Sequence, residues 1–151
     1  MNSILIDSDI LIDVARGRDA RLLARWTEVS GSDTIIACSP VTVAKMWHGA
    51  RPKEYMALTA LFGALTCIPI GPEIGRRAGE YLRQFAKSHH VELGDAFVAA
   101  TATIHDLALW TRNRKHYPMK DCRFFSIARY AGNISGPPDL FSRKGFATHK
   151  V

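Results

Sequence analysis

The sequence predicts an α/β domain in which helices flank a central, mostly parallel sheet of four to five strands. Short apolar segments of β type alternate along the chain with longer segments that carry apolar residues at helical spacing. This alternation is typical of parallel sheets, because parallel strands need a crossover connection, which is usually a helix. A chain of 151 residues has the size of one domain.

The N-terminal residues predict a strand followed by two helices. Residues 3–7 are apolar up to Asp7 and predict a buried strand. Asp9 is expected to cap the next helix, which should end near Gly17, because glycine readily adopts the left-handed conformation that ends many helices. A second helix is expected over residues 19–30.

A second strand is expected over residues 34–38, and a helix start follows it directly. Serine is a good helix cap and proline suits the first helical position, so Ser39 and Pro40 together predict a helix. We expect this helix to run to about Arg51, and a fourth helix to cover residues 52–65.

The second half of the chain continues the alternation. Its expected elements are an extended segment over residues 66–70, a helix over 73–88, a helix that begins at Gly94, and strands over 107–111 and 123–125.

The chain is expected to divide into one domain and a tail. Residues 1–130 form the predicted domain, and residues 131–151 form the predicted tail. Glycines and prolines interrupt any periodicity in this tail, which predicts irregular structure there.

The composition favours binding to polyanions. The chain has 20 Lys and Arg against 14 Asp and Glu, a net charge of +6 and a pI of about 9.5. Such an excess suits RNA, DNA or an acidic partner segment, although a merely basic surface is the alternative. The three cysteines lack paired metal-ligand spacing, so no zinc site is expected. No apolar run approaches the roughly 20 residues of a membrane-spanning helix, and we expect a cytoplasmic protein that does not bind membranes.

Three polar residues from distant parts of the sequence are expected to meet at one edge of the sheet. Asp7 closes the first strand, Asp95 begins a helix, and Asn113 follows the strand over 107–111. Ligands of parallel sheets bind outside the carboxyl ends of the strands. Clustered carboxylates repel one another, and Mg²⁺ or Mn²⁺ offsets this repulsion. A metal site is therefore predicted, although each aspartate alone could be a simple turn or cap residue.

Four segments resemble the sequence motifs of PIN domains. They are ILIDSDILID at residues 4–13, SPVTVA and WHGAR within 39–51, DAFVAATA at 95–102, and WTRN at 110–113. Each motif is short, but all four occur in order over about residues 3–125. The chain thus resembles the PIN-domain ribonucleases of the VapC type, which are the toxins of type II toxin–antitoxin systems.

The resemblance implies a PIN-like three-layer fold and a metal-dependent endoribonuclease, in which activated water attacks a phosphodiester of RNA. Asp7 and Asp95 match acids of the family and are the expected ligands of Mg²⁺ or Mn²⁺. Asn113 occupies a position of the fourth motif where the family has Asp or Asn, and its carbonyl oxygen can coordinate a metal or order water. Asp9 and Thr111 are expected to support the site.

Lys45 departs from the family pattern, because the second motif usually carries Glu at this position. The change replaces a negative charge with a positive one at a site expected to hold a cation. Lys45 could pair with Asp9 and leave Asp7 and Asp95 with one weaker metal, could itself occupy the cation position, could disable a toxic enzyme, or could be a solvated helix lysine. The alternative function is accordingly a PIN fold with an impaired metal site, which binds RNA or antitoxin without efficient cleavage.

The basic residues after the fourth motif are expected to contact RNA. Arg112, Arg114 and Lys115 could hold phosphates beside the metal, and a solvated basic loop is the alternative interpretation. Three histidines are instead expected to be surface or packing residues: His89, His90 and His116.

The resemblance also implies protein partners. VapC-type toxins are neutralised by a small antitoxin whose C-terminal segment covers the active-site groove, and they commonly form dimers. We therefore expect a VapB-type antitoxin and a homodimer. The candidate surface residues are apolar residues of the early helices, for which core packing is the other interpretation: Leu22, Trp26, Trp47, Tyr55 and Leu58.

One rival family shares a feature of the first motif. Asp7 and Asp9 after an apolar strand also resemble the start of haloacid-dehalogenase-type phosphatases, in which the first aspartate is a phosphorylated nucleophile. The usual Gly-Thr continuation and the late paired acids of that family are missing, so this is a remote alternative.

Overall fold

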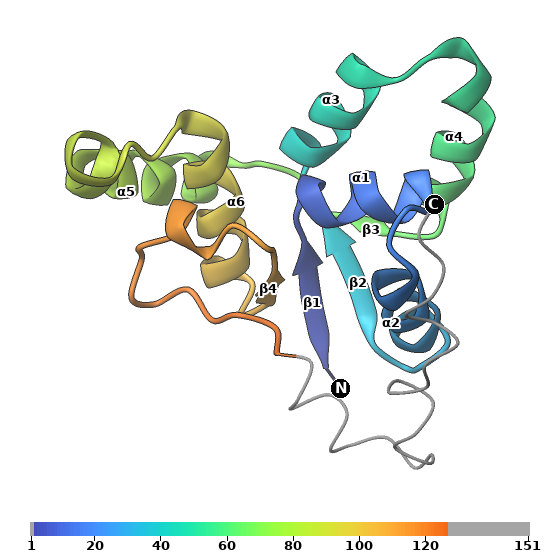
Figure 1. The fold of residues 1–151 in the computed structure, drawn as a ribbon. Coiled ribbons are helices and arrows are strands. Elements are labelled where there is room, and N and C mark those ends of the chain that lie inside the picture. The colour runs from blue at the N-terminus through green and yellow to red at the C-terminus, as the bar shows by residue number, and fades with distance from the viewer. Residues whose placement is uncertain (1, 127–151) are drawn as a thin grey trace.

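The computed structural model describes residues 2–126 and contains one parallel sheet (Figure 1). Its strand order is β3-β2-β1-β4, and every neighbouring pair is parallel. The strands are β1 (Ser3–Ile6), β2 (Ile35–Cys38), β3 (Thr66–Cys67) and β4 (Ala108–Trp110). The α/β fold expected from the sequence is confirmed, with four strands in the sheet.

Helices cover both faces of this sheet and produce three layers. In chain order they are α1 (Ser8–Arg16), α2 (Ala20–Ser30), α3 (Pro40–Gly49), α4 (Tyr55–Gly63), α5 (Pro72–His89) and α6 (Leu93–Ile104), with short 3-10 turns η1 (Pro52–Glu54) and η2 (Arg114–His116). Figure 1 shows α5 and α6 together on one side of the strands and α1, α2 and α4 on the other. The layered arrangement predicted from the alternation is therefore present.

The central strand β1 divides the hydrophobic core into two parts. Successive side chains of a strand point to opposite faces of the sheet. Leu5 accordingly packs in the cluster formed with α5 and α6, whereas Ile4 and Ile6 pack in the cluster formed with α1, α2 and α4. All three side chains are at most 1% exposed, so β1 is fixed on both faces and its carboxyl end is a rigid base for a site.

Most of the predicted helix ends are confirmed, and one is wrong. The Ser39 side chain accepts the Val41 N–H at 3.1 Å and begins α3, as expected. Gly17 ends α1 with a positive φ of 64°. The residue that caps α1, however, is Asp7 and not Asp9, because the helix already starts at Ser8 directly after the strand. Asp7 thus directly follows β1 and is also the residue that caps α1.

The strand expected over residues 123–125 is not formed as a full strand. Phe124 makes one isolated parallel bridge with Leu109, supported by hydrogen bonds from Leu109 N to Arg123 O and from Phe125 N to Leu109 O, both 2.8 Å. Because β4 has only three residues, this single pair takes up the hydrogen-bonding groups of Leu109 on its outer edge, and the pairing does not extend into a longer strand. The predicted domain end at residue 130 and the predicted tail over 131–151 lie outside the described residues.

The apolar candidates for partner surfaces divide into two groups. Leu22 and Leu58 are buried in the core, and Trp26 packs against it. Trp47 and Tyr55 are 37% and 44% exposed, and their ring centroids lie 5.3 Å apart. Core packing is therefore the role of the first group, while the second lies at the surface where α3 leads into α4. None of the helices within residues 2–126 has the length and apolar character needed to cross a membrane.

Candidate active site

Asp7 lies at the carboxyl end of β1, where its side chain is 5% exposed. Its backbone N–H donates to Trp110 O at 3.0 Å, which extends the pairing of β1 with β4. Its Oδ1 accepts the Ser8 N–H at 2.8 Å. Its Oδ2 accepts the Thr111 hydroxyl at 3.0 Å and the Tyr117 hydroxyl at 2.7 Å. A buried carboxylate is costly without such partners, and these three donors fix its position.

Asp95 lies in the first turn of α6 and is 8% exposed. Burial raises the pKa of its carboxyl group, and the nearby charge of Asp7 raises it further. The Glu92 N–H, His116 and Lys45 act in the opposite direction on this pKa. Because the charge of Asp7 acts on Asp95, and the charges of both acids act on Tyr117, the structure brings these two predicted site residues to the same edge of the sheet.

Tyr117 donates to Asp7, lies within reach of the charge of Asp95, and was not among the residues expected from the sequence. Burial raises the pKa of its phenol, and the negative charges of Asp7, Asp95 and Asp9 raise it further. The phenol therefore stays protonated and acts as a donor. It follows the turn η2, whose three residues return the chain towards β1. No pattern in the sequence could have indicated this return, since a single 3-10 turn has no periodicity.

Lys45 faces the same site from α3. A Cβ atom at position 94 would lie 3.6 Å from the Lys45 Nζ and 3.3 Å from Val41 Cγ1, so the glycine leaves room for α3 and the lysine beside α6. Of the alternatives for Lys45, the hypothesis of a pair with Asp9 is not supported: no such ion pair occurs within residues 2–126, and the charge of Lys45 acts on Asp95.

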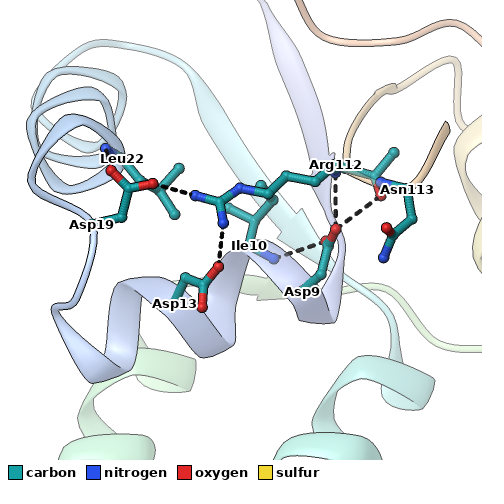
Figure 2. A network of polar contacts seen from close by, with 8 residues as sticks. Asp9, Ile10, Asp13, Asp19, Leu22, Arg112 and Asn113 are labelled. Atoms are coloured by element: carbon teal, nitrogen blue, oxygen red, sulfur yellow. Dashed lines mark hydrogen bonds and ion pairs between the residues drawn. The ribbon is translucent and has the colours of Figure 1, made fainter.

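Asp9 is bound to the segment that follows β4 (Figure 2). Its Oδ2 accepts the Arg112 backbone N–H at 2.9 Å and the Thr111 hydroxyl at 3.4 Å, and its Oδ1 accepts the Ile10 N–H at 2.8 Å. Burial raises the pKa of Asp9, and the charge of Asp7 adds to this effect. Thr111 therefore donates towards two acids at once, which agrees with its expected supporting position.

The Arg112 side chain forms ion pairs with two other aspartates. Its guanidinium lies 2.5 Å from Asp13 Oδ2 and 2.6 Å from Asp19 Oδ2, as Figure 2 shows. The Leu22 N–H, which donates to Asp19 at 3.1 Å, lowers the pKa of Asp19 most, and Arg112 lowers it further. We call Arg112, Asp13 and Asp19 the arginine clamp. It joins the segment after β4 to both α1 and the start of α2, so this guanidinium already has carboxylate partners.

The other predicted residues after β4 lie at the surface. Asn113 donates its backbone N–H to the Thr111 hydroxyl at 3.1 Å, and its side-chain amide makes no hydrogen bond within the described chain. The Arg114 guanidinium lies 4.9 Å from the centre of the Phe124 ring. Lys115 is exposed. The metal role expected of Asn113 and the RNA contacts expected of the basic residues stay predictions.

His116 lies closer to the acids than the sequence analysis expected. Its Nδ1 is 3.8 Å from Asp95 Oδ2, although half of its side chain is exposed. A position directly after two basic residues gave no sign of this proximity, because it depends on how η2 orients the ring towards α6. His116 therefore belongs to the surroundings of Asp95.

The donor set suits a small divalent cation with few protein ligands. Within residues 2–126 no group of three His, Cys, Asp or Glu side chains could hold a metal ion. Asp7 and Asp95 nevertheless offer carboxylate oxygens at one place, and Mg²⁺ is commonly bound by one or two carboxylates together with water and substrate phosphates. Asp7 and Asp95 are the residues that could hold such an ion.

Replacing Tyr117 by Phe tests the anchoring of Asp7. The variant removes the 2.7 Å hydrogen bond to a buried carboxylate, and we expect the free energy of unfolding to fall by about 1.5–3 kcal/mol. Urea unfolding measures this change. Tyr55→Phe is the matched control, because Tyr55 is 44% exposed. An equal loss in both variants would contradict the assigned role of the Tyr117 hydroxyl.

Comparison with known proteins places the chain in a family. Residues 4–121 match the family model described as PIN domain. Ribonuclease VapC10 of Mycobacterium tuberculosis is 39% identical over 118 residues, which cover 77% of this chain and 86% of that protein. Ribonuclease VapC19 of the same organism is 35% identical over 116 residues, with coverage of 76% and 92%.

A solved structure shows the same relationship. The toxin-antitoxin complex from Klebsiella pneumoniae contains a chain with a TM-score of 0.62 and 26% identity, covering 79% of this chain and 94% of that one. The motif pattern expected from the sequence is thereby confirmed. The chain belongs to the PIN domain family, among the proteins named VapC.

Proposed function

We propose that this chain is a metal-dependent endoribonuclease toxin that cleaves RNA phosphodiesters. One observation carries the proposal: Asp7 and Asp95 are two buried acids from different elements, and the charge of Asp7 reaches the Asp95 carboxyl group. The ribonuclease names of VapC10 and VapC19 support the substrate class. The basic net charge of +6 supports it as well, because RNA is a polyanion.

The proposed metal, Mg²⁺ or Mn²⁺, would be held by Asp7 and Asp95, with Asn113 at its edge. When bound, such an ion lowers the pKa of a coordinated water and stabilises charge on a phosphate. The protein's own part is orientation: the donors from Ser8 and Thr111 hold the Asp7 carboxylate in one place. Preorganisation of this kind is what lets a small site stabilise a charged transition state.

Asp95 has a second proposed role in the reaction. Its buried position beside the proposed metal would place this carboxylate where it could accept the proton that the attacking water loses. Lys45 and His116 face Asp95 and act on its pKa in the direction opposite to burial.

The proposed partners follow from the family. The Klebsiella structure is a toxin–antitoxin complex, and we propose that a VapB-type antitoxin neutralises this chain in the cytoplasm. We further propose a homodimer. The exposed pair Trp47 and Tyr55 is a candidate surface for one of these contacts, because two neighbouring aromatic rings at a surface are typical of interfaces.

Removing a proposed metal ligand should abolish cleavage. We expect Asp7→Asn and Asp95→Asn to lower the rate of Mg²⁺- or Mn²⁺-dependent cleavage of single-stranded RNA by at least about 100-fold, since even changes beside metal ligands cost 10–100-fold. Gel analysis of labelled RNA measures the rate. Asp33→Asn, at an exposed position, is the control and should cleave normally. Cleavage that persists in excess EDTA, or in Asp7→Asn, would refute the metal mechanism.

Lys45→Glu should strengthen metal binding. The positive charge of Lys45 faces Asp95, and reversing it should lower the Mg²⁺ concentration needed for half-maximal cleavage by about tenfold or more. Lys45→Gln removes the charge without reversing it and should have an intermediate effect. An unchanged Mg²⁺ requirement in both variants would place Lys45 outside the site. Absence of cleavage by the natural chain, restored in Lys45→Glu, would instead favour an impaired site.

A further inference from the structure

A second hollow, separate from the acids, lies next to them between α2 and the end of β4. Its volume is about 500 Å³, which is within the range of small-molecule and nucleotide sites. The charged residues of its wall are Asp19, Arg21, Arg25, Arg112 and Arg114. Four arginines and one aspartate thus line the hollow, and no lysine among the described residues 2–126 does so. We call this hollow the arginine pocket.

Two of these arginines form no ion pair with a carboxylate among the described residues. Arg112 is held by the arginine clamp, whereas Arg21 and Arg25 form no ion pair with any residue in the range 2–126. They are four positions apart on α2, where like charges repel. Burial lowers the pKa of Arg25, the charges of Arg21 and Arg112 lower it further, and the charge of Asp19 acts in the opposite direction. Because arginines outnumber acids in this wall, the excess positive charge favours an anionic ligand.

The type of residue narrows the ligand to a phosphate or a carboxylate. The planar guanidinium of arginine matches phosphate oxygens through paired hydrogen bonds, which the single ammonium of lysine cannot do. A carboxylate of an acidic peptide would satisfy the same fork. The choice between an RNA phosphate and a carboxylate of a protein segment therefore depends on where the pocket lies relative to the candidate active site.

The pocket shares its wall with the candidate active site. Thr111 lines the pocket and also donates its hydroxyl to Asp7. Arg112 lines it with its side chain, while its backbone N–H donates to Asp9. An RNA strand with one phosphate at Asp7 would therefore bring a neighbouring phosphate to the pocket without leaving the surface.

We propose that Arg21 and Arg25, with Arg114, form a subsite that binds a phosphate of the RNA strand beside the cleaved bond. This inference rests on the proposed ribonuclease function and extends it by assigning residues of α2 to substrate binding. The subsite contributes affinity without reading base sequence, since phosphate contacts position a nucleic acid and do not identify its bases.

The test measures binding of a fluorescein-labelled single-stranded RNA 12-mer by anisotropy, in EDTA so that binding does not depend on cleavage. We expect Arg21→Gln/Arg25→Gln to weaken binding by about tenfold or more. The slope of log affinity against log salt should fall by about 0.7, since the variant loses one single-strand phosphate contact, which contributes about that much. Arg21→Lys/Arg25→Lys keeps the charge and should keep the slope while losing affinity.

The control removes the same charge elsewhere. Arg83 and Lys87 are exposed and also four positions apart, on α5, so Arg83→Gln/Lys87→Gln should leave the affinity and slope close to those of the natural chain. An equal loss of affinity in the control would show that the effect depends only on net charge and would overturn the inference. Unchanged RNA binding in the α2 variant would also overturn it. If that variant instead lost binding of a labelled glutamate decapeptide, the pocket would be a site for an acidic protein segment. The ribonuclease proposal fails on a different result, which is that the unmodified chain does not cleave RNA in Mg²⁺ or Mn²⁺.

Discussion

The hydrogen bonds that Thr111 and Tyr117 donate to Asp7 hold together parts of the chain that are more than 100 residues apart. Placing a carboxylate in the interior costs free energy unless donors surround it. The negative charge of Asp7 also acts on the second acid, Asp95, and raises its pKa. Two like charges therefore repel one another at this edge of the sheet, and the Thr111 and Tyr117 hydroxyls together with the Ser8 N–H hold Asp7 in position there. A divalent cation between the acids would relieve the same repulsion, which is the physical link between the stability of this site and its proposed chemistry.

The segment after β4 contributes to the site in two ways, with a backbone donor to Asp9 and with a side chain that fixes the segment to α1 and α2. The Arg112 N–H holds Asp9, while the Arg112 guanidinium is held by the arginine clamp. Arg112 was expected to contact RNA together with its basic neighbours, because charge alone does not distinguish a guanidinium paired within the protein from one that faces solvent. Arg21 and Arg25 on α2, in contrast, have no such carboxylate partners among the described residues, so they are the better candidates to bind an external anion.

Local patterns predicted the fold, and topology predicted the two acids. Helix and strand signals depend on neighbours a few residues away, so the start of α3 at Ser39 was recognisable. Asp7 and Asp95 were recognisable because strand ends and helix starts of parallel sheets meet at one edge. Tyr117 and His116 were not, since their approach to the acids depends on the irregular turn η2. The direction of Lys45 towards Asp95 was equally hidden, because it depends on how closely α3 approaches α6 at Gly94.

Joint binding of one divalent cation by Asp7 and Asp95 can be measured by anomalous diffraction from crystals of the chain grown with Mn²⁺. We expect a manganese peak at coordination distance, about 2.1 Å, from carboxylate oxygens of both residues. A structure of manganese-treated crystals without a peak there, or with the ion bound only by residues elsewhere, would contradict such joint binding.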